Sequence, residues 1–165
     1  MRKTELSGLN VNPFKLIGKE WFLVTSGNPE SYNTMTASWG QMGHLWGKDV
    51  FTCHIRPNRH TFGFIEENDL FTVSFFREDY KSALAFCGSR SGRDCDKAKE
   101  TGLTPIPLGG SITFEEAYMV FVCKKLYTEP MKADGFILGD IVEKFYGTDP
   151  LHKSFTAEIV EVFVK

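Results

Sequence analysis

Apolar and polar residues alternate along two stretches of the chain. At residues 51–55 and 71–75 the odd positions hold Phe, Cys, Ile or Val, and the even positions hold Thr, His or Ser. Because successive side chains of a β-strand point to opposite faces, this alternation predicts half-buried strands. Similar patterns predict four more strands, at residues 21–25, 35–39, 118–127 and 155–164. The last two are long enough to form main strands of a barrel or a strongly curved sheet.

Helical patterns are fewer, and each lies between predicted strands. The clearest helix is predicted from Asp79, as its N-cap, to Gly88, as its stop signal. A second helix is predicted at residues 134–147, with an apolar stripe along one face. The stripe consists of Ile137, Leu138, Ile141 and Phe145. A third helix is predicted at residues 58–68.

The order of these elements predicts the fold class. The strands follow one another without regular βαβ alternation, which argues against a doubly wound parallel sheet. We therefore expect a mainly β fold, a β-barrel with added helices. Residues 101–111 are rich in proline and glycine and predict one long connection. No linker or repeat divides the 165 residues, so we expect a single domain over residues 1–165.

Composition narrows the possible functions. Hydrophobic residues make up 42% of the chain, which is enough for a packed core and excludes a disordered protein. The 19 basic and 21 acidic residues give a net charge of −2, so we expect no nucleic-acid or membrane partner. No apolar run predicts a membrane span, and the charged N-terminus lacks a signal core, so a cytoplasmic protein is expected. The four cysteines are too few for a disulfide framework and are expected to be reduced.

Three polar segments are candidates for a functional site, and the first is residues 33–40, Asn-Thr-Met-Thr-Ala-Ser-Trp-Gly. Its small side chains leave backbone N–H groups accessible, and Trp39 can flank a flat ring. The alternative is an edge strand whose Thr and Ser side chains face water. Both interpretations fit the residue pattern.

The second candidate segment, residues 53–61, leads from a strand through a proline turn into the start of a helix. It brings Arg56, Arg59 and the hydroxyl of Thr61 to that helix start. Unpaired N–H groups and the helix dipole favour a phosphate there. The alternative is that both arginines are surface charges beside the glutamates at residues 66–67.

The third candidate segment, residues 87–97, is a glycine-broken loop with three basic residues, leading into a short helix capped by Asp94. Such a loop is suited to close over a phosphate or a substrate. Cys95 lies between Arg93 and Lys97, whose charges favour a thiolate. The more common alternative is a cysteine with no chemical role.

Other familiar chemistry is not indicated. His54 and His60 have no carboxylate or cysteine at a recognised ligand spacing, so no metal site is expected, and they are either pocket residues or satisfied polar side chains. No P-loop, G-x-S-x-G elbow or Ser/His/Asp order supports phosphoryl transfer or covalent catalysis. The glycines of residues 40–47 do not form G-x-G-x-x-G, so a nicotinamide is not expected to bind in a Rossmann domain.

Taken in order, these motifs resemble the flavin reductase-like family of FMN-binding split barrels, and within it the flavoredoxin-like branch. Residues 33–40 resemble the family's N-x-M-T-x-S-W strand, and residues 54–61 resemble its R-x-T turn. Residues 91–97 are similar to its S-G-x-D-x-D-K loop, and the CKKLY strand at residues 123–127 matches as well. The branch's Y…D-x-H closure is represented by Tyr146, Asp149 and His152. Five motifs in the right order cover most of the chain.

The resemblance implies a split β-barrel of Greek-key type that binds FMN. The residues implied to contact the isoalloxazine ring or the ribityl chain are Thr36, Ala37, Ser38 and Trp39. The residues implied to hold the phosphate are Arg59, Thr61 and Lys97, with secondary contacts from Asn33, His54 and Ser91. The resemblance also implies a homodimer with the flavin near the interface, so that a partner chain contributes pocket walls near His152.

The function that the resemblance implies is an FMN-dependent oxidoreductase that takes hydride from NADH or NADPH. The cofactor carries that chemistry, so no side chain is assigned as acid, base or nucleophile. A first alternative keeps the FMN but makes the protein an electron carrier that a partner protein reduces. A second alternative is a non-enzymatic barrel that binds another phosphorylated ligand or a protein partner.

Overall fold

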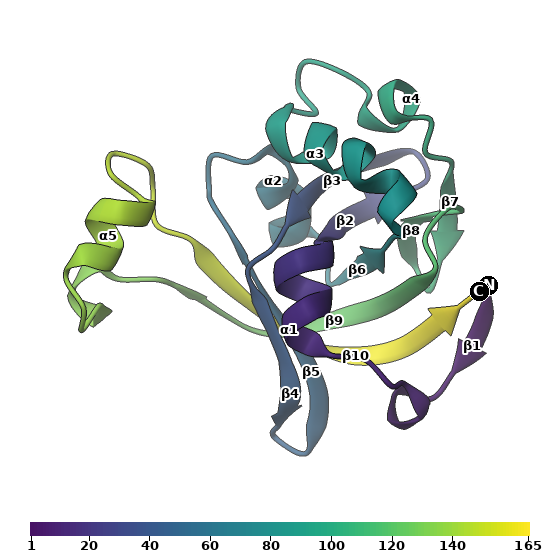
Figure 1. Ribbon diagram of the computed structural model, residues 1–165, viewed down its shortest axis with the longest axis horizontal. Coiled ribbons are helices and arrows are strands. Elements are labelled where there is room, and N and C mark those ends of the chain that lie inside the picture. The colour runs from purple at the N-terminus through teal and green to yellow at the C-terminus, as the bar shows by residue number, and fades with distance from the viewer.

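A large antiparallel sheet forms most of the protein, whose computed structural model describes residues 1–165 (Figure 1). Seven strands pair in the order β3-β2-β6-β9-β10-β5-β4, and β1 pairs with the far end of β10. The bounds are β1 Arg2–Thr4, β2 Phe22–Asn28, β3 Ser31–Ala37, β4 Gly40–Leu45, β5 Lys48–Ile55, β6 Leu70–Phe75, β9 Met119–Pro130 and β10 Lys153–Val164. The predicted mainly β fold class is confirmed.

The sheet has to curl because of how β3 and β4 are connected. These strands form its two edges, yet only residues 38 and 39 separate them in the chain. The three steps from Ala37 to Gly40 reach at most about 11 Å, whereas the edges of a flat seven-stranded sheet are about 29 Å apart, at about 4.8 Å between neighbouring strands. The two edges must therefore approach one another, and β3 indeed lies against β5 without pairing with it. This gap in the barrel is where the functional candidates gather.

Short helices and turns, together with a small hairpin, surround the sheet. The helices and turns are η1 Leu6–Gly8, α1 Pro13–Lys15, η2 Leu16–Glu20, α2 His60–Glu67, η3 Glu78–Tyr80, α3 Lys81–Ser89, α4 Lys97–Thr101, η4 Ala133–Gly135 and α5 Asp140–Phe145. The hairpin consists of β7 Pro105–Leu108 and β8 Ser111–Phe114. No helix in the structure is long and apolar enough to cross a membrane.

Alternating residues of the strands feed two separate cores. Phe22 and Val24 of β2 point into a cluster of 19 buried residues inside the barrel, whereas Leu23 points out. Leu23 belongs to a second cluster of 10 residues, which α3 and α4 cover from outside. Each fully buried Phe or Leu side chain contributes about 1.5–3 kcal/mol to folding. The alternation seen in the sequence therefore anchors both the barrel and the helices that border its gap.

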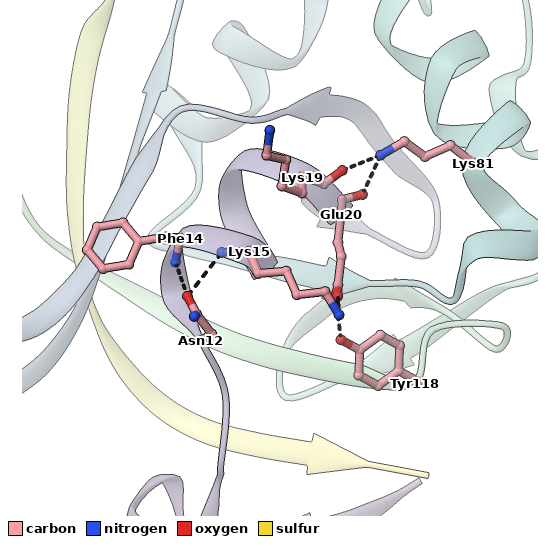
Figure 2. A network of polar contacts seen from close by, with 7 residues as sticks. All are labelled: Asn12, Phe14, Lys15, Lys19, Glu20, Lys81 and Tyr118. Carbon is pink, nitrogen blue, oxygen red and sulfur yellow. Dashed lines mark hydrogen bonds and ion pairs between the residues drawn. The ribbon is translucent and has the colours of Figure 1, made fainter.

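The N-terminal helical segment is tied to the sheet and to α3 by polar contacts (Figure 2). The π-turn η2 ends at Glu20, whose carboxylate pairs with Lys15 at 3.1 Å and accepts a hydrogen bond from the Tyr118 hydroxyl at 3.1 Å. The Lys81 ammonium donates to the carbonyls of Lys19 and Glu20 and lies 3.6 Å from the ring centroid of Trp21. These contacts stabilise Trp21 in a positive-φ conformation (68°) that non-glycine residues rarely adopt.

Several sequence predictions were wrong in detail. The connection predicted at residues 101–111 contains most of the β7–β8 hairpin, whose proline-bearing strand pairs on one side only. The helix predicted at 134–147 shrinks to η4 and α5, because its apolar stripe has no surface to pack against: Ile137 is 98% exposed. The predicted cap Asp94 does not cap α4; the Asp96 carboxylate does, accepting from the Lys99 amide at 3.2 Å.

Other differences concern element boundaries. The helix predicted from Asp79 begins as a 3-10 turn, and α3 itself starts at Lys81 without a side-chain cap. The strands β1 and β4 had not been predicted; β4 contains two glycines and is largely exposed, so it shows no apolar alternation. The strand predicted at residues 35–39 begins earlier, at Ser31, and ends at Ala37.

Candidate functional site

A cleft of about 400 Å³ opens at the gap between the two edges of the sheet. Its walls come from the end of β3 and the link to β4 (residues 35–39), from His54 of β5, from Arg56, Asn58 and Arg59 in the following turn, and from Asp149 and His152. We call it the wide cleft. Three of its lining residues, Thr36, Ala37 and Ser38, are small, which leaves space beside the indole of Trp39.

A second cavity of about 220 Å³ lies next to the wide cleft. We call it the narrow cavity. The eight residues around it are all polar or charged: Asn58, Arg59, His60, Thr61, Ser89, Arg90, Ser91 and Lys97. Asn58 and Arg59 border both spaces, so the two spaces are neighbours; together we call them the groove, with a mixed end and a strongly basic end.

Arg59 supplies the cation at the junction of the two spaces. One nitrogen of its guanidinium donates to the Gly88 carbonyl at 2.7 Å, which joins the turn before α2 to the end of α3. Burial and the nearby charge of Arg56 lower the pKa of Arg59, but a guanidinium remains protonated at any physiological pH. Arg59 is also the N-cap residue of α2, and no side chain caps that helix. Free N–H donors and the positive helix end therefore face the narrow cavity.

Lys97 lies behind the narrow cavity and is only 5% exposed. Its ammonium donates to the carbonyls of Thr34 at 2.8 Å and Cys87 at 2.9 Å, which joins β3, α3 and α4. Burial lowers the pKa of Lys97 to about 8, and Arg59 contributes to the lowering. The third ammonium hydrogen has no partner in the protein, so Lys97 both holds the wall together and retains one donor for an anion.

The loop between α3 and α4 closes the narrow cavity by approaching β3 very tightly. A Cβ atom on Gly92 would lie 1.9 Å from Asn33 Oδ1 and 3.2 Å from the His60 ring. Asn33 is fixed in turn, because its amide donates to the Thr61 hydroxyl at 2.7 Å. Asn33 and Thr61 are both buried. Glycine at position 92 therefore allows the loop to pack against Asn33 and His60, next to Ser91, which borders the narrow cavity.

The outer wall of the wide cleft is aromatic. The Trp39 ring centroid lies 5.0 Å from that of His152 and 5.6 Å from that of Phe145. His152 Nδ1 is 3.0 Å from the Tyr146 hydroxyl, whereas its Nε2 has no hydrogen-bond partner in the protein. Burial lowers the pKa of His152 to about 4, with smaller effects from Arg56, His54 and Arg59. His152 is therefore a neutral imidazole at neutral pH.

His54 is also neutral at neutral pH, but both of its ring nitrogens are used. Nδ1 lies 2.9 Å from the Ser154 hydroxyl, and Nε2 lies 3.2 Å from the Gln41 side-chain oxygen. Burial lowers the pKa of His54. The arrangement makes His54 a satisfied polar residue that also borders the cleft.

A single known family accounts for this arrangement, since its profile, the flavin reductase like domain, matches residues 14–164. The chain belongs to this family. No curated protein sequence matches the chain. The family assignment confirms the resemblance drawn from the five motifs, and the match covers every strand of the sheet except β1 and all the residues that border the groove.

Solved structures show the same fold at low sequence identity. The flavoredoxin of Desulfovibrio vulgaris is 23% identical with a TM-score of 0.69, covering 100% of this chain and 77% of its own. An FMN-binding protein of Thermus thermophilus with bound p-hydroxybenzaldehyde is 22% identical with a TM-score of 0.70, covering 100% and 82%. An FMN-binding domain of a flavin reductases-like enzyme from Shewanella baltica is 17% identical with a TM-score of 0.71, covering 99% and 76%. The predicted split-barrel fold is thereby confirmed.

The structure brings nine of the ten predicted site residues to the groove. Those at the wide cleft are Thr36, Ala37, Ser38, Trp39 and His54; Arg59 borders both spaces; Thr61, Ser91 and Lys97 border the narrow cavity. Asn33 borders neither space and acts on Thr61 instead. The binding roles of all ten stay predictions.

The structure also separates the two arginines that the sequence had placed at one anion site. Arg59 faces the basic end, whereas Arg56 pairs with Asp149 on the outer wall of the wide cleft. The alternative that both lie beside residues 66–67 is wrong, since Glu66 pairs with Lys153 instead. Sequence reasoning missed Asn58 as a wall of both spaces; its only signal was its position between the two arginines.

Proposed function

We propose that the chain is an FMN-dependent oxidoreductase that uses NADH or NADPH. The observation that carries the proposal is the groove, whose two neighbouring spaces differ in the way that the two ends of FMN differ. A space lined by an indole and small residues suits a flat ring, and an all-polar basic space suits a phosphate. We call them the ring end and the phosphate end.

The donors at the phosphate end suit a dianion. Arg59 keeps the guanidinium hydrogens that Gly88 does not use, and Lys97 keeps one ammonium hydrogen. The uncapped start of α2 adds backbone N–H groups. No acidic residue borders this space, so nothing repels a phosphate.

At the ring end the chain orients the flat ring and shields it from solvent. Thr36 is held by its hydroxyl, which donates to the Leu84 carbonyl, so the strand that faces the ring is fixed against α3. Trp39 and His152 form the opposite wall. FMN, when bound, supplies the hydride and electron transfer between a nicotinamide and an acceptor, which is why no acid or base is assigned to the chain.

The decisive experiment is the absorbance spectrum of the purified protein, followed by identification of the released flavin and titration of the flavin-free protein with FMN and riboflavin. We expect a yellow protein that binds FMN more tightly than riboflavin. Stopped-flow mixing of the oxidised protein with NADH and with NADPH then tests whether either nicotinamide reduces the bound flavin rapidly. Slow reduction by both would favour an electron carrier served by a partner protein, and a colourless protein that takes up no FMN would contradict the proposal.

We further propose that the chain forms a homodimer. Support comes from large apolar side chains that face solvent at two places on the surface. Trp46, at the tip of the β4–β5 hairpin, is 60% exposed, and Ile137 is 98% exposed. Multi-angle light scattering tests this proposal directly, since a monomer at micromolar concentration would contradict it.

A further inference from the structure

The segment between β9 and β10, residues 131–152, extends away from the sheet as an arm. It contains η4 and α5, and Figure 1 shows it projecting from the barrel beyond the ends of the two long strands. Its outer side chains Ile137 and Leu138 are exposed, so the arm has little apolar packing that would fix its position. Within one chain, polar and aromatic contacts position it.

Those contacts lie at the end of the arm that borders the wide cleft. Phe145, Tyr146 and His152 place their ring centroids 5.6, 6.4 and 5.0 Å from the Trp39 ring. The Tyr146 hydroxyl in turn lies 3.0 Å from His152 Nδ1. The outer wall of the cleft is therefore part of the arm, and its shape depends on where the arm sits.

Arg56 connects this wall to the barrel. It follows directly after β5, and its guanidinium makes three contacts with the arm. One nitrogen forms an ion pair with Asp149, a second donates to the Phe145 carbonyl at 2.8 Å, and the group lies 5.4 Å from the Tyr146 ring centroid. All three contacts use the planar, forked shape of the group, which a lysine cannot reproduce.

We propose that Arg56 is a positioning residue that holds the arm against Trp39 and so forms the outer wall of the ring end. The effect of this role on flavin binding rests on the proposed function, whereas the contact between Arg56 and the arm does not. An isolated surface ion pair contributes little, and Asp149 is half exposed. Here the ion pair is combined with a charge-assisted hydrogen bond to the backbone and a cation–π contact on one side chain.

The test is hydrogen exchange measured by mass spectrometry on the flavin-free protein. In Arg56→Met and Arg56→Lys we expect the amides of residues 140–152 to exchange about tenfold faster than in the wild type, as loss of a charge-assisted hydrogen bond implies. The amides of β9 and β10 should keep their protection. Asp149→Asn should accelerate exchange in the same region, and combining it with Arg56→Met should add little.

Lys153→Met is the matched control, because Lys153 also forms an ion pair near this end of the sheet, with Glu66. It should leave exchange of the arm unchanged. The positioning role is wrong if Arg56→Met leaves residues 140–152 as protected as before, or if Lys153→Met accelerates them equally. Should Arg56→Met fail to fold, Asp149→Asn tests the same contact from the other side, because Asp149 lies on the surface of the arm.

A second readout follows His152 by NMR titration, with its signal assigned from His152→Gln. The wild-type pKa is about 4, mainly because the ring is buried. In Arg56→Lys a positive charge remains, so a rise of the pKa toward 6.5 reports that the arm has moved away from Trp39. An unchanged pKa contradicts the role. If the wild type takes up no flavin while both readouts change as expected, only the proposed function fails.

Discussion

The two ends of the groove are built in opposite ways. At the phosphate end, Lys97, Arg59 and Asn33 join four elements, β3, α2, α3 and α4, through short hydrogen bonds, and most of the atoms involved are buried. At the ring end, the barrel forms one wall. The arm forms the other, and its contacts with Arg56 and Trp39 hold it in place. Affinity for a ligand that spans both should therefore depend mostly on the rigid end, and access should depend on the movable one.

This comparison predicts the largest effect at Gly92. In Gly92→Ala the new methyl group would lie 1.9 Å from Asn33 Oδ1, and Asn33 cannot retreat without breaking its bond to Thr61. The loop must move outward, and we expect FMN affinity to fall about a hundredfold. Isothermal titration calorimetry measures this affinity. The control is Gly63→Ala, where nothing lies within 4 Å of the new atom. Equal affinity for Gly92→Ala and the wild type would show that the loop does not shape the site.

Arg59→Met should have the next largest effect. Losing a charge-assisted contact to phosphate costs about 1.5–3 kcal/mol, which weakens FMN binding by roughly ten- to a hundredfold. Riboflavin has no phosphate and serves as the internal control, since its affinity should change little. If both ligands weakened equally, the effect would come from the lost bond to the Gly88 carbonyl and not from the phosphate.

The elements that are easy to predict from sequence are those that feed a core. The strands around residues 51–55 and 71–75 show their alternation because Phe51, Ile55 and Phe71 are fully buried in the barrel. The prediction that both strands are half-buried is wrong for β6, because β8 covers its other face and buries Thr72 and Ser74 as well. In contrast, β4 is an exposed strand fixed by pairing with β5 alone, and pairing leaves no mark in the hydrophobic pattern. In the arm the hydrophobic pattern is misleading in the opposite way. Its apolar stripe predicts a helix at residues 134–147, but no surface packs against the stripe, and α5 covers only Asp140–Phe145.

Site residues follow the same rule. The three polar segments stood out because they carry more basic and hydroxyl groups than a core requires, and they contain the ten site residues that the family resemblance implies, nine of which border the groove. The local sequence does not show in which direction a side chain points. Arg56 and Arg59 are three residues apart, yet one reaches the arm and the other the basic end, because the partners Asp149 and Gly88 come from distant parts of the chain.

A pH dependence should separate the two ends further. Loss of the Lys97 proton above about pH 8 removes a charge from the phosphate end, so FMN affinity should fall by at most about tenfold per pH unit there. Riboflavin affinity should stay level, and Lys97→Met should abolish the pH dependence. A level FMN curve for the wild type up to about pH 9.5 would mean that the ammonium does not face the phosphate.

The stability of the flavin-free protein should respond to Lys97 with the opposite sign. The folded-state pKa lies below the ordinary value of 10.5, so between about pH 8 and 10.5 the unfolded chain binds more protons. The free energy of unfolding should then rise with pH relative to Lys97→Met in this window. Urea denaturation at several pH values across the window measures the difference in free energy of unfolding between the wild type and Lys97→Met. This difference should stay constant with pH if the ammonium is well solvated.

The smallest effect should come from Trp39, and it tests the comparison from the other side. Trp39 is 39% exposed and touches only movable partners, so Trp39→Leu should weaken ring binding by about 1 kcal/mol, roughly fivefold. Because the indole acts on the ring alone, FMN and riboflavin should lose the same factor, unlike in Arg59→Met. Paired titrations of both flavins decide the matter: a loss confined to FMN would place the indole near the phosphate, and the division of the groove into two ends would be wrong.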